Sequence, residues 1–349
     1  MIGIAALTLV PGRVGGSETY LRELLRALDP DALPFRLLLP PAAAGLETGL
    51  PTVIAPGGRP QTGTARLLSM AAALADPRVR RPLADAAVVH YPLTIPLPPS
   101  RAATIVTLHD VQHLELPHLF GAAERAFRRL AYDRAARRAA RVVVVSGFVR
   151  DRAAALLGLD PGRIQVIHSG VDHAVFHPVR GEREPFLLYP ARPWPHKNHR
   201  RLLEAFALVR RAQPELRLVL TGGGTHGPLP DGVEAAGLVG LDELASLYRR
   251  AAAVVFPSLY EGFGQPILEA MACGCPVACS EVASLPEVAG GAARLFDPED
   301  PRSIAEAVQD VLAAAPAWSA RGIERAAEFS WATTARAHEA LYRELSNAS

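Results

Sequence analysis

The most constraining feature of the sequence is the stretch 254–279, in which a strand, a glycine loop, a helix and a second strand follow one another. The apolar run 254–256 predicts a buried strand. The loop 261–264 holds two glycines, which let a backbone turn with positive φ or approach a ligand closely. Pro266 suits the first turn of a helix, because the N–H that it lacks would have no partner there. Every other segment can be placed relative to this unit.

The glycine loop is also a natural site for an anion. Free N–H groups and the positive end of the helix dipole both favour phosphate at a helix start. Glu261 and Glu269 flank this point, and a carboxylate beside a phosphate repels it. The two carboxylates are therefore better suited to hydroxyl groups, and the pattern indicates a ligand that carries both phosphates and sugars.

This stretch resembles the paired-glutamate motif of retaining glycosyltransferases with the two-domain GT-B fold, and in particular glycosyltransferase family 4. The matching residues are Glu261, Gly262, Phe263, Gly264, Pro266, Ile267 and Glu269. The resemblance implies an α/β fold of two Rossmann-like, doubly wound parallel-sheet domains facing a cleft. It also implies that Glu261 holds donor-sugar hydroxyls and Glu269 the ribose hydroxyls. The alternative is an ordinary strand–helix unit with surface glutamates.

Two cations follow a strand in the second half of the chain. Arg192 and Lys197 lie five residues apart, after the strand 186–189 and before the helix 202–210. Arginine can grip a pyrophosphate through two bonds, and lysine adds a compact charge. The resemblance gives both residues this role on the leaving diphosphate, although Ala191 stands where the family usually has glycine. A structural ion pair is the alternative.

His109 is the second focus of the sequence, because it comes at the carboxyl end of the predicted strand 104–108. Ligands of open α/β sheets bind at such strand ends. The text around His109 and Asp110 resembles family members that transfer mannose or related sugars, in which this histidine lies near the donor sugar. We therefore assign His109 a catalytic role, with a structural histidine as the alternative. His113 and His118 belong either to the acceptor side or to the loop surface.

The remaining donor-site candidates are glycines and a serine. In the resembling family a Gly-Gly loop after the first strand approaches the diphosphate, which assigns Gly15 and Gly16, while Ser17 is the predicted N-cap of the helix 18–28. Gly222 lies in a loop that could close around a nucleotide. Ser146 begins a helix and matches a family serine near the active cleft.

The chain has 349 residues, enough for two domains that each bury a core. We place an acceptor-side domain at 1–178, a linker at 180–184 and a nucleotide-sugar domain at 185–330. A closing helix at 331–349 is predicted to cross back to the first domain. Residues 57–65 are predicted to form a mobile loop.

Composition excludes several classes of function. A net charge of +2 is too mild to indicate nucleic acid. The absence of an apolar run of 18 residues or of a signal peptide predicts a cytoplasmic protein. The arginine-rich stretch 122–141 is either a contact with the inner membrane face or a solvated helix face, and we favour the second. The three cysteines at 273, 275 and 279 are read as buried, reduced residues, not as metal ligands.

The predicted function is that of a retaining hexosyltransferase. Its donor is a nucleotide-diphosphate sugar, with GDP-mannose favoured and UDP- or dTDP-sugars next, and its acceptor is a glycan, a lipid-linked sugar or a small molecule. No cofactor or metal is expected, since no convincing acidic metal motif is found. A nucleotide-sugar epimerase of the same fold and a catalytically inert binding protein are the alternatives.

Overall fold

The computed structural model describes residues 1–12, 15–56, 76–224 and 227–348. The loop predicted at 57–65 lies outside these residues. The chain divides into two compact units. The first contains Met1–Gly170 together with Trp331–Ser349, and the second contains Val171–Ser330.

The sheet of the first unit has seven parallel strands in its described part, in the order β3-β2-β1-β4-β5-β6-β7. Because the order reverses direction between β1 and β4, the strand ends at this point are where a doubly wound sheet binds ligands. The strands are β1 (Ile2–Ala5), β2 (Phe35–Leu39), β3 (Thr52–Ile54), β4 (Val88–Tyr91), β5 (Ala103–Leu108), β6 (Arg141–Val144) and β7 (Ile164–Val166).

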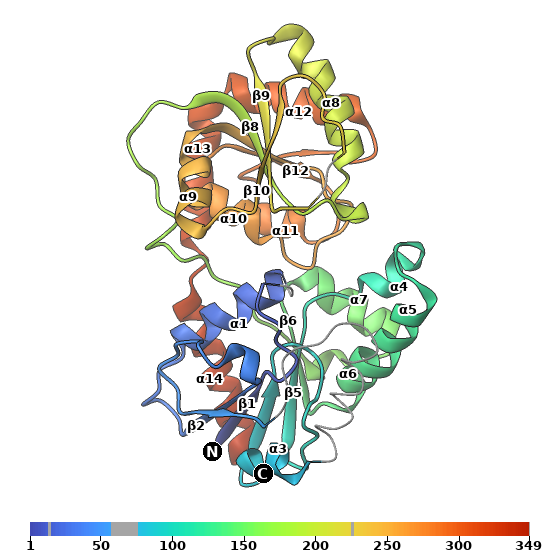
Figure 1. The fold of residues 1–349 in the computed structure, drawn as a ribbon, viewed down its shortest axis with the longest axis vertical. Coiled ribbons are helices and arrows are strands. Elements are labelled where there is room, and N and C mark those ends of the chain that lie inside the picture. The colour runs from blue at the N-terminus through green and yellow to red at the C-terminus, as the bar shows by residue number, and fades with distance from the viewer. Residues whose placement is uncertain (13–14, 57–75, 225–226, 349) are drawn as a thin grey trace. The chain divides into compact units, whose positions relative to one another are not determined.

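Helices cover both faces of this sheet (Figure 1). On one face, α1 (Gly16–Ala27) packs beside α14 (Trp331–Asn347), which also contacts β4. The other face buries alanine, valine and leucine side chains of α6 and α7 against the central strands. The helices between the strands are α3 (Pro77–Arg80), α4 (Gln112–Glu115), α5 (Ala122–Arg128), a π-helical turn (Arg129–Asp133), α6 (Arg134–Arg138) and α7 (Gly147–Leu157).

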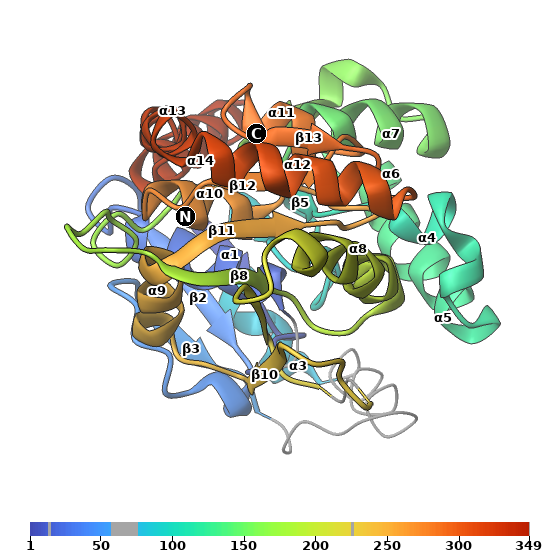
Figure 2. The same cartoon turned by 90° about the horizontal axis from the view of Figure 1, so that it is seen from above.

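The second unit has a six-stranded parallel sheet in the order β10-β9-β8-β11-β12-β13, counted over its described residues. Its central neighbours β8 and β11 lie side by side, as Figure 2 shows from above. The strands are β8 (Glu184–Pro190), β9 (Arg217–Thr221), β10 (Val233–Gly237), β11 (Ala251–Phe256), β12 (Val277–Ser280) and β13 (Arg294–Phe296).

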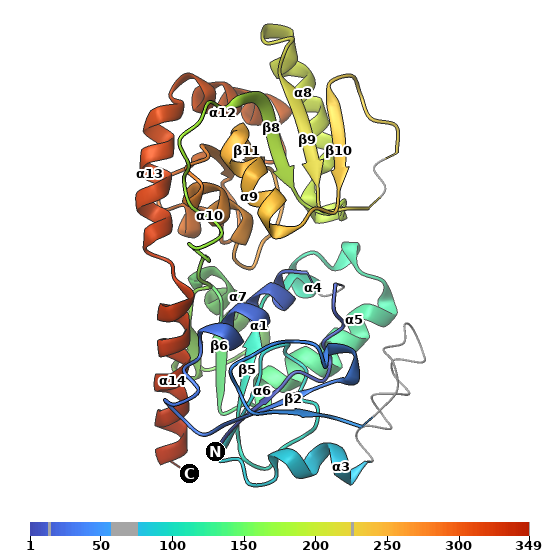
Figure 3. The same cartoon turned by 60° about the vertical axis from the view of Figure 1, so that its left-hand side comes forward.

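Its helices also form two layers (Figure 3). The helices α8 and α12 pack together on one face, and α10 packs with α9 and α13 on the other. The three cysteines lie buried with free thiols in the passage from α10 into β12, and burial raises the pKa of each thiol to about 12. The helices are α8 (His199–Ala212), α9 (Leu241–Arg250), α10 (Gln265–Ala272), α11 (Leu285–Ala289), α12 (Pro301–Ala313) and α13 (Ala315–Ala327).

The first unit ends earlier than the sequence suggested. Val171 forms a bridge with Ser330, and the Arg249 guanidinium donates to the carbonyls of Val175 and His177, so residues after Gly170 pack with the second unit. The predicted linker 180–184 is also wrong at its end. Arg183 donates to the carbonyls of the last turn of α9, and β8 already begins at Glu184.

Candidate functional site

An ion pair lies at the carboxyl ends of the central strands of the second unit. Lys197 ends a short 3₁₀ turn (Pro195–Lys197) after β8, and Glu261 lies in the loop after β11. Lys197 Nζ is 2.5 Å from Glu261 Oε1, and each side chain is 13% exposed. The two residues meet because β8 and β11 are neighbours in the sheet, although 64 positions separate them in the sequence. The pair therefore places a cation and a carboxylate at one point.

The turn that carries Lys197 is fixed by buried hydrogen bonds. The Tyr189 hydroxyl donates to the Lys197 carbonyl at 2.6 Å. Asn198 adopts the left-handed conformation at φ 60°, and its side-chain amide donates to the carbonyls of Pro257 and Pro298. The Lys197 ammonium also lies 5.3 Å from the centre of the Phe256 ring. These contacts hold the ammonium in place before any ligand binds.

The loop that carries Glu261 is held by hydrogen bonds from a buried serine. The buried Ser284 hydroxyl lies 3.0 Å from the carbonyl oxygen of Glu261 and 2.8 Å from that of Phe263. Gly264 has φ 105°, and a Cβ there would lie 2.6 Å from Leu285 Cδ2. The position therefore requires glycine, because a side chain would be strained and would displace Leu285. Phe263 is buried with its ring 6.0 Å from that of Phe329.

Helix α10 starts directly after Gly264, with Pro266 in its first turn as predicted. Ile267 and its apolar neighbours are fully buried. Glu269 is 7% exposed and accepts a hydrogen bond of 3.1 Å from the Tyr248 hydroxyl. Burial, and then the Glu269 carboxylate, raise the pKa of Tyr248 well above its usual value. The two carboxylates of the motif thus differ in their partners, since Glu261 pairs with a cation and Glu269 with a phenol.

Arg192 and Gly222 lie at the ends of the neighbouring strands β8 and β9. The Arg192 guanidinium carbon is 5.7 Å from the centre of the Trp194 ring. Gly222 has φ 106°, and a Cβ there would lie 2.8 Å from the Ala191 carbonyl carbon and 2.9 Å from the Arg192 nitrogen. Gly222 therefore lets its loop pack against the backbone that carries Arg192.

In the first unit, His109 directly follows β5. Its Nε2 lies 2.8 Å from the Pro92 carbonyl oxygen. A carbonyl can only accept, so Nε2 carries the proton and donates. The Tyr20 ring packs edge-on at 4.9 Å between centroids. Burial lowers the pKa of His109, which keeps the imidazole neutral at neutral pH with Nδ1 as an acceptor.

A buried polar network behind His109 ties it to α14. The Tyr20 hydroxyl is 2.9 Å from His338 Nε2, and His338 Nδ1 is 2.8 Å from the Thr334 carbonyl. His338 also stacks on His90, whose ring nitrogens lie 2.7 Å from the Tyr342 hydroxyl and 2.8 Å from the Thr107 hydroxyl. The network fixes the ring against which His109 packs.

The other candidates of the first unit lie at helix starts. Gly15, at φ 65°, is the N-cap of α1 and Gly16 is its first residue, so the prediction of Ser17 as N-cap is wrong. The turn comes two residues earlier because Gly15 accepts a positive φ without strain. Ser146 is the N-cap of α7, and its fully buried hydroxyl accepts from the Val149 N–H at 3.2 Å.

The structure thus groups the predicted residues into one set for each unit. Gly15, Gly16, His109 and Ser146 belong to the first unit, and Arg192, Lys197, Gly222, Glu261, Gly262, Phe263, Gly264, Pro266, Ile267 and Glu269 to the second. Sequence reasoning missed the supporting residues Asn198, Tyr248 and Ser284. Ser284, directly before the Leu-Pro start of a helix, carried a detectable signal as a helix cap.

The part of the chain that the structure describes offers neither a metal centre nor a membrane-spanning helix. It contains no cluster of three or more metal-ligating side chains. None of the helices described here is long and apolar enough to cross a membrane.

Each of the two units matches a family model of known proteins. A family model described as Glycosyltransferase Family 4 matches residues 14–175, and one described as Glycosyl transferases group 1 matches residues 184–314. O-antigen chain mannosyltransferase B of Escherichia coli is 38% identical over 162 residues, which are 42% of each chain. O-antigen chain mannosyltransferase RfbU of Salmonella typhimurium is 30% identical over 230 residues, which are 62% of each chain.

Among solved structures, sucrose-phosphate synthase from Thermosynechococcus elongatus aligns with a TM-score of 0.82 at 23% identity, covering 100% of this chain and 99% of the other. Two Rossmann-like parallel-sheet units with such a neighbour define the GT-B fold class. The family 4 model matches within the first half of the chain and the group 1 model within the second, so the chain is similar to family 4-like glycosyltransferases across both units. The matches span about half of the two curated mannosyltransferases, 42% and 62% of their lengths.

Proposed function

We propose that the protein is a retaining glycosyltransferase that moves a hexose from a nucleoside diphosphate sugar to a hydroxyl of an acceptor. The observation that carries the proposal is the Lys197–Glu261 pair beside the start of α10. A cation next to the positive end of a helix dipole suits a diphosphate, and a carboxylate there suits sugar hydroxyls. The mannosyltransferase relatives favour mannose as the transferred sugar. GDP-mannose is the first candidate donor, with UDP- and dTDP-sugars as alternatives.

In this proposal the bond from the sugar C1 to the diphosphate oxygen breaks, and a bond from C1 to the acceptor oxygen forms on the same face. Arg192, Lys197 and the N-terminus of α10 stabilise the negative charge that grows on the departing diphosphate. The acceptor proton passes to a departing phosphate oxygen. Glu261 orients donor-sugar hydroxyls, and Glu269 orients the ribose with its carboxylate positioned by Tyr248. Neutral His109 accepts a hydrogen bond through Nδ1 from the transferred sugar.

The proposal assigns leaving-group stabilisation to these side chains, so activity should survive chelation of divalent metals. We place the reaction in the cytoplasm, on a glycan, lipid-linked or small-molecule acceptor. Several arginines of 122–141 are exposed, among them Arg129, Arg134 and Arg138. Their exposure suits both a solvated face and contact with an anionic membrane, and sedimentation with anionic vesicles separates the two.

The test is incubation of the purified protein with GDP-mannose, UDP-glucose and dTDP-glucose and a panel of sugar acceptors, with EDTA present. We expect one donor to release its diphosphate, and the proton NMR spectrum of the product to show the anomeric configuration of the donor. Lys197→Ala serves as the negative control. Inverted product would contradict the retaining mechanism, and failure to release any diphosphate would contradict the activity itself.

A further inference from the structure

The helical turn α4 carries an unusual concentration of buried polar atoms without partners. Among the residues that the structure describes, Gln112 Nε2, His113 Nδ1 and Glu115 Oε2 are buried and form no hydrogen bond. Nearly all buried polar atoms in native proteins are paired, so each exception requires an explanation. Three exceptions in one turn, three residues after His109, indicate that something polar is bound here.

This turn is held rigidly by its surroundings. His113 Nε2 lies 2.9 Å from Asp133 Oδ1, and Asp133 belongs to the π-helical turn. Arg152 Nε donates to Glu115 Oε1 at 2.6 Å. The Gln112 N–H donates to Asp110 Oδ1 at 3.1 Å. Because the His113 and Glu115 side chains and the Gln112 backbone are fixed in this way, the unpaired atoms of His113 and Glu115 cannot easily turn to find partners within the protein.

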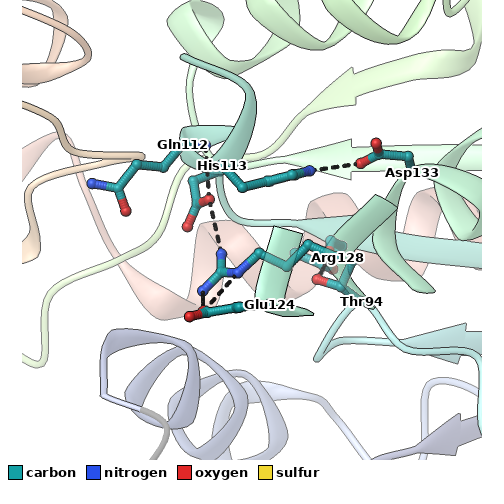
Figure 4. Close-up of polar contacts among 8 residues, drawn as sticks. Thr94, Gln112, His113, Glu124, Arg128 and Asp133 are labelled. Carbon is teal, nitrogen blue, oxygen red and sulfur yellow. Dashed lines mark hydrogen bonds and ion pairs between the residues drawn. The ribbon is translucent and has the colours of Figure 1, made fainter. Parts of the chain in front are cut away.

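The side chains that carry the unpaired atoms point in two directions. Gln112 and Glu115 are three positions apart in a helical turn, which places them on the same side. Figure 4 shows the Gln112 side chain pointing away from His113, whose ring points to Asp133. The Gln112 amide is a donor, and Glu115 Oε2 is an acceptor. The Gln112 residue is only 7% exposed, so its unpaired donor is well shielded from solvent.

A donor and a carboxylate acceptor on one side match hydroxyl groups, which both accept and donate. They match a phosphate poorly, because phosphate oxygens accept hydrogen bonds and the Glu115 carboxylate has no hydrogen to donate to them. Asp110 adds a second carboxylate nearby, 3.8 Å from the Arg128 guanidinium, which offsets part of its charge. The polar character of this strand end is therefore that of a site for an uncharged polyol.

We propose that α4 binds the hydroxyls of an uncharged sugar in the acceptor, with Gln112 and Glu115 as the residues that select it. This inference rests on the proposed glycosyl transfer, which supplies the need for an acceptor. It goes further by naming the acceptor's chemical class at this position as a neutral sugar.

The experiment replaces Gln112 with leucine, which keeps a similar size and removes the donor. Gln165→Leu is the matched control, since Gln165 is an exposed glutamine of the same unit, on β7. Both variants are compared with the wild type for donor KM, acceptor KM, donor hydrolysis and thermal stability. The acceptor probes are methyl glycosides of mannose, glucose, galactose and N-acetylglucosamine, together with the corresponding 6-phosphates.

We expect Gln112→Leu to raise the KM for the neutral acceptor about tenfold, the size of a lost hydrogen bond to an uncharged group. Donor KM and donor hydrolysis should not change. The melting temperature should stay the same or rise, because an unpaired buried donor has been removed. Gln165→Leu should leave both KM values unchanged.

The possible failures are distinguishable. An unchanged acceptor KM in Gln112→Leu overturns the inference, as does a wild type that hydrolyses its donor but uses only phosphorylated acceptors, or no acceptor of the panel. A lower melting temperature with unchanged acceptor KM identifies Gln112 as a structural residue that binds internal water, which also overturns it. Donor that is neither hydrolysed nor transferred contradicts the proposed function instead.

Discussion

The two units present different chemistry at equivalent places, the carboxyl ends of central parallel strands. In the second unit the strand ends carry an ion pair, Lys197 and Glu261, in loops fixed by Asn198 and Ser284. In the first unit the end of β5 carries His109, which is neutral and packed against Tyr20. One site is built around a lysine–glutamate ion pair and the other around a neutral histidine.

This difference shows how one architecture serves two kinds of ligand. Parallel sheets bring loops together at one edge, but the residues in the loops decide the chemistry. A fixed cation at a helix start suits a diphosphate, whereas an unpaired amide donor and a carboxylate acceptor suit hydroxyls. Substitutions in the charged groups of the second unit should therefore change donor binding. Substitutions in the polar groups of the first unit should change binding of the acceptor or of the transferred sugar.

The largest expected effect comes from Lys197→Ala. Removing a preorganised group that stabilises transition-state charge typically costs about 100- to 1,000-fold in rate, and kcat/KM should fall by this amount. Lys197→Arg keeps the charge and should recover part of the activity. Steady-state kinetics of diphosphate release give the comparison. Activity of Lys197→Ala within about threefold of the wild type, as for an ordinary surface ion pair, would contradict the charged character of this site.

The second effect is a pH dependence of stability in the first unit. Burial lowers the pKa of His338 from 6.5 to about 4, and burial together with the neighbouring His338 lowers that of His90. The unfolded chain therefore binds more protons between these values. The free energy of unfolding is highest above pH 6.5 and falls as the pH drops toward 4. The protonation of His338 alone lowers it by about 3 kcal/mol at pH 4.

Urea unfolding at pH 7.5, 6.0 and 5.0 measures this slope. The unfolding free energy should fall with pH, and hydrogen exchange should place the early loss of protection in α14, where His338 meets Tyr20. The His338→Gln variant should show a shallower slope. An unfolding free energy that does not change from pH 7.5 to 5.0 would show that His90 and His338 take up protons in the folded protein as easily as in the unfolded chain. It would contradict a neutral histidine network in the first unit.

A smaller effect follows from Gly264→Ala. The residue has φ 105°, and the new methyl group would meet Leu285 at 2.6 Å. Strained conformations of this kind cost about 1–3 kcal/mol, which should appear in thermal unfolding. Gly16→Ala is the control, because a Cβ at Gly16 meets nothing within 4 Å. Equal stability of the two variants would show that the Glu261 loop is not held tightly.

The smallest effect is expected for Tyr248→Phe. This change removes the hydroxyl that donates to Glu269 and leaves the ring in place. Donor KM should rise about three- to tenfold, since a hydrogen bond to a charged group contributes about 1.5–3 kcal/mol but the carboxylate itself is kept. The acceptor KM should not change. A change in acceptor KM alone would contradict the assignment of Glu269 to the donor.

Much of this arrangement could be predicted from the sequence, because periodic patterns report local structure. The helix predicted at 202–210 lies within α8 (His199–Ala212), and Pro266 lies in the first turn of α10 as expected. The partners of the motif residues could not be predicted in this way. The Lys197–Glu261 pair and the contact from Tyr248 to Glu269 depend on which strands and helices become neighbours, and the sequence pattern does not determine that order.

The boundary between the units was misplaced for the same reason. Polar residues at 180–184 are typical of a linker. Arg183, however, donates hydrogen bonds to the carbonyls at the end of α9 and so packs against the second unit. The unpaired amide of Gln112 was also invisible, since only the folded structure shows that it is buried without a partner.

The most direct test of the account is the affinity of nucleoside diphosphates for the wild type, Lys197→Ala and His109→Ala. Isothermal titration with GDP, UDP and dTDP measures it without any acceptor. We expect one diphosphate to bind the wild type, Lys197→Ala to weaken that binding at least tenfold, and His109→Ala to leave it unchanged. Equal affinity of Lys197→Ala and the wild type, or a larger loss in His109→Ala, would contradict the division of roles between the two units.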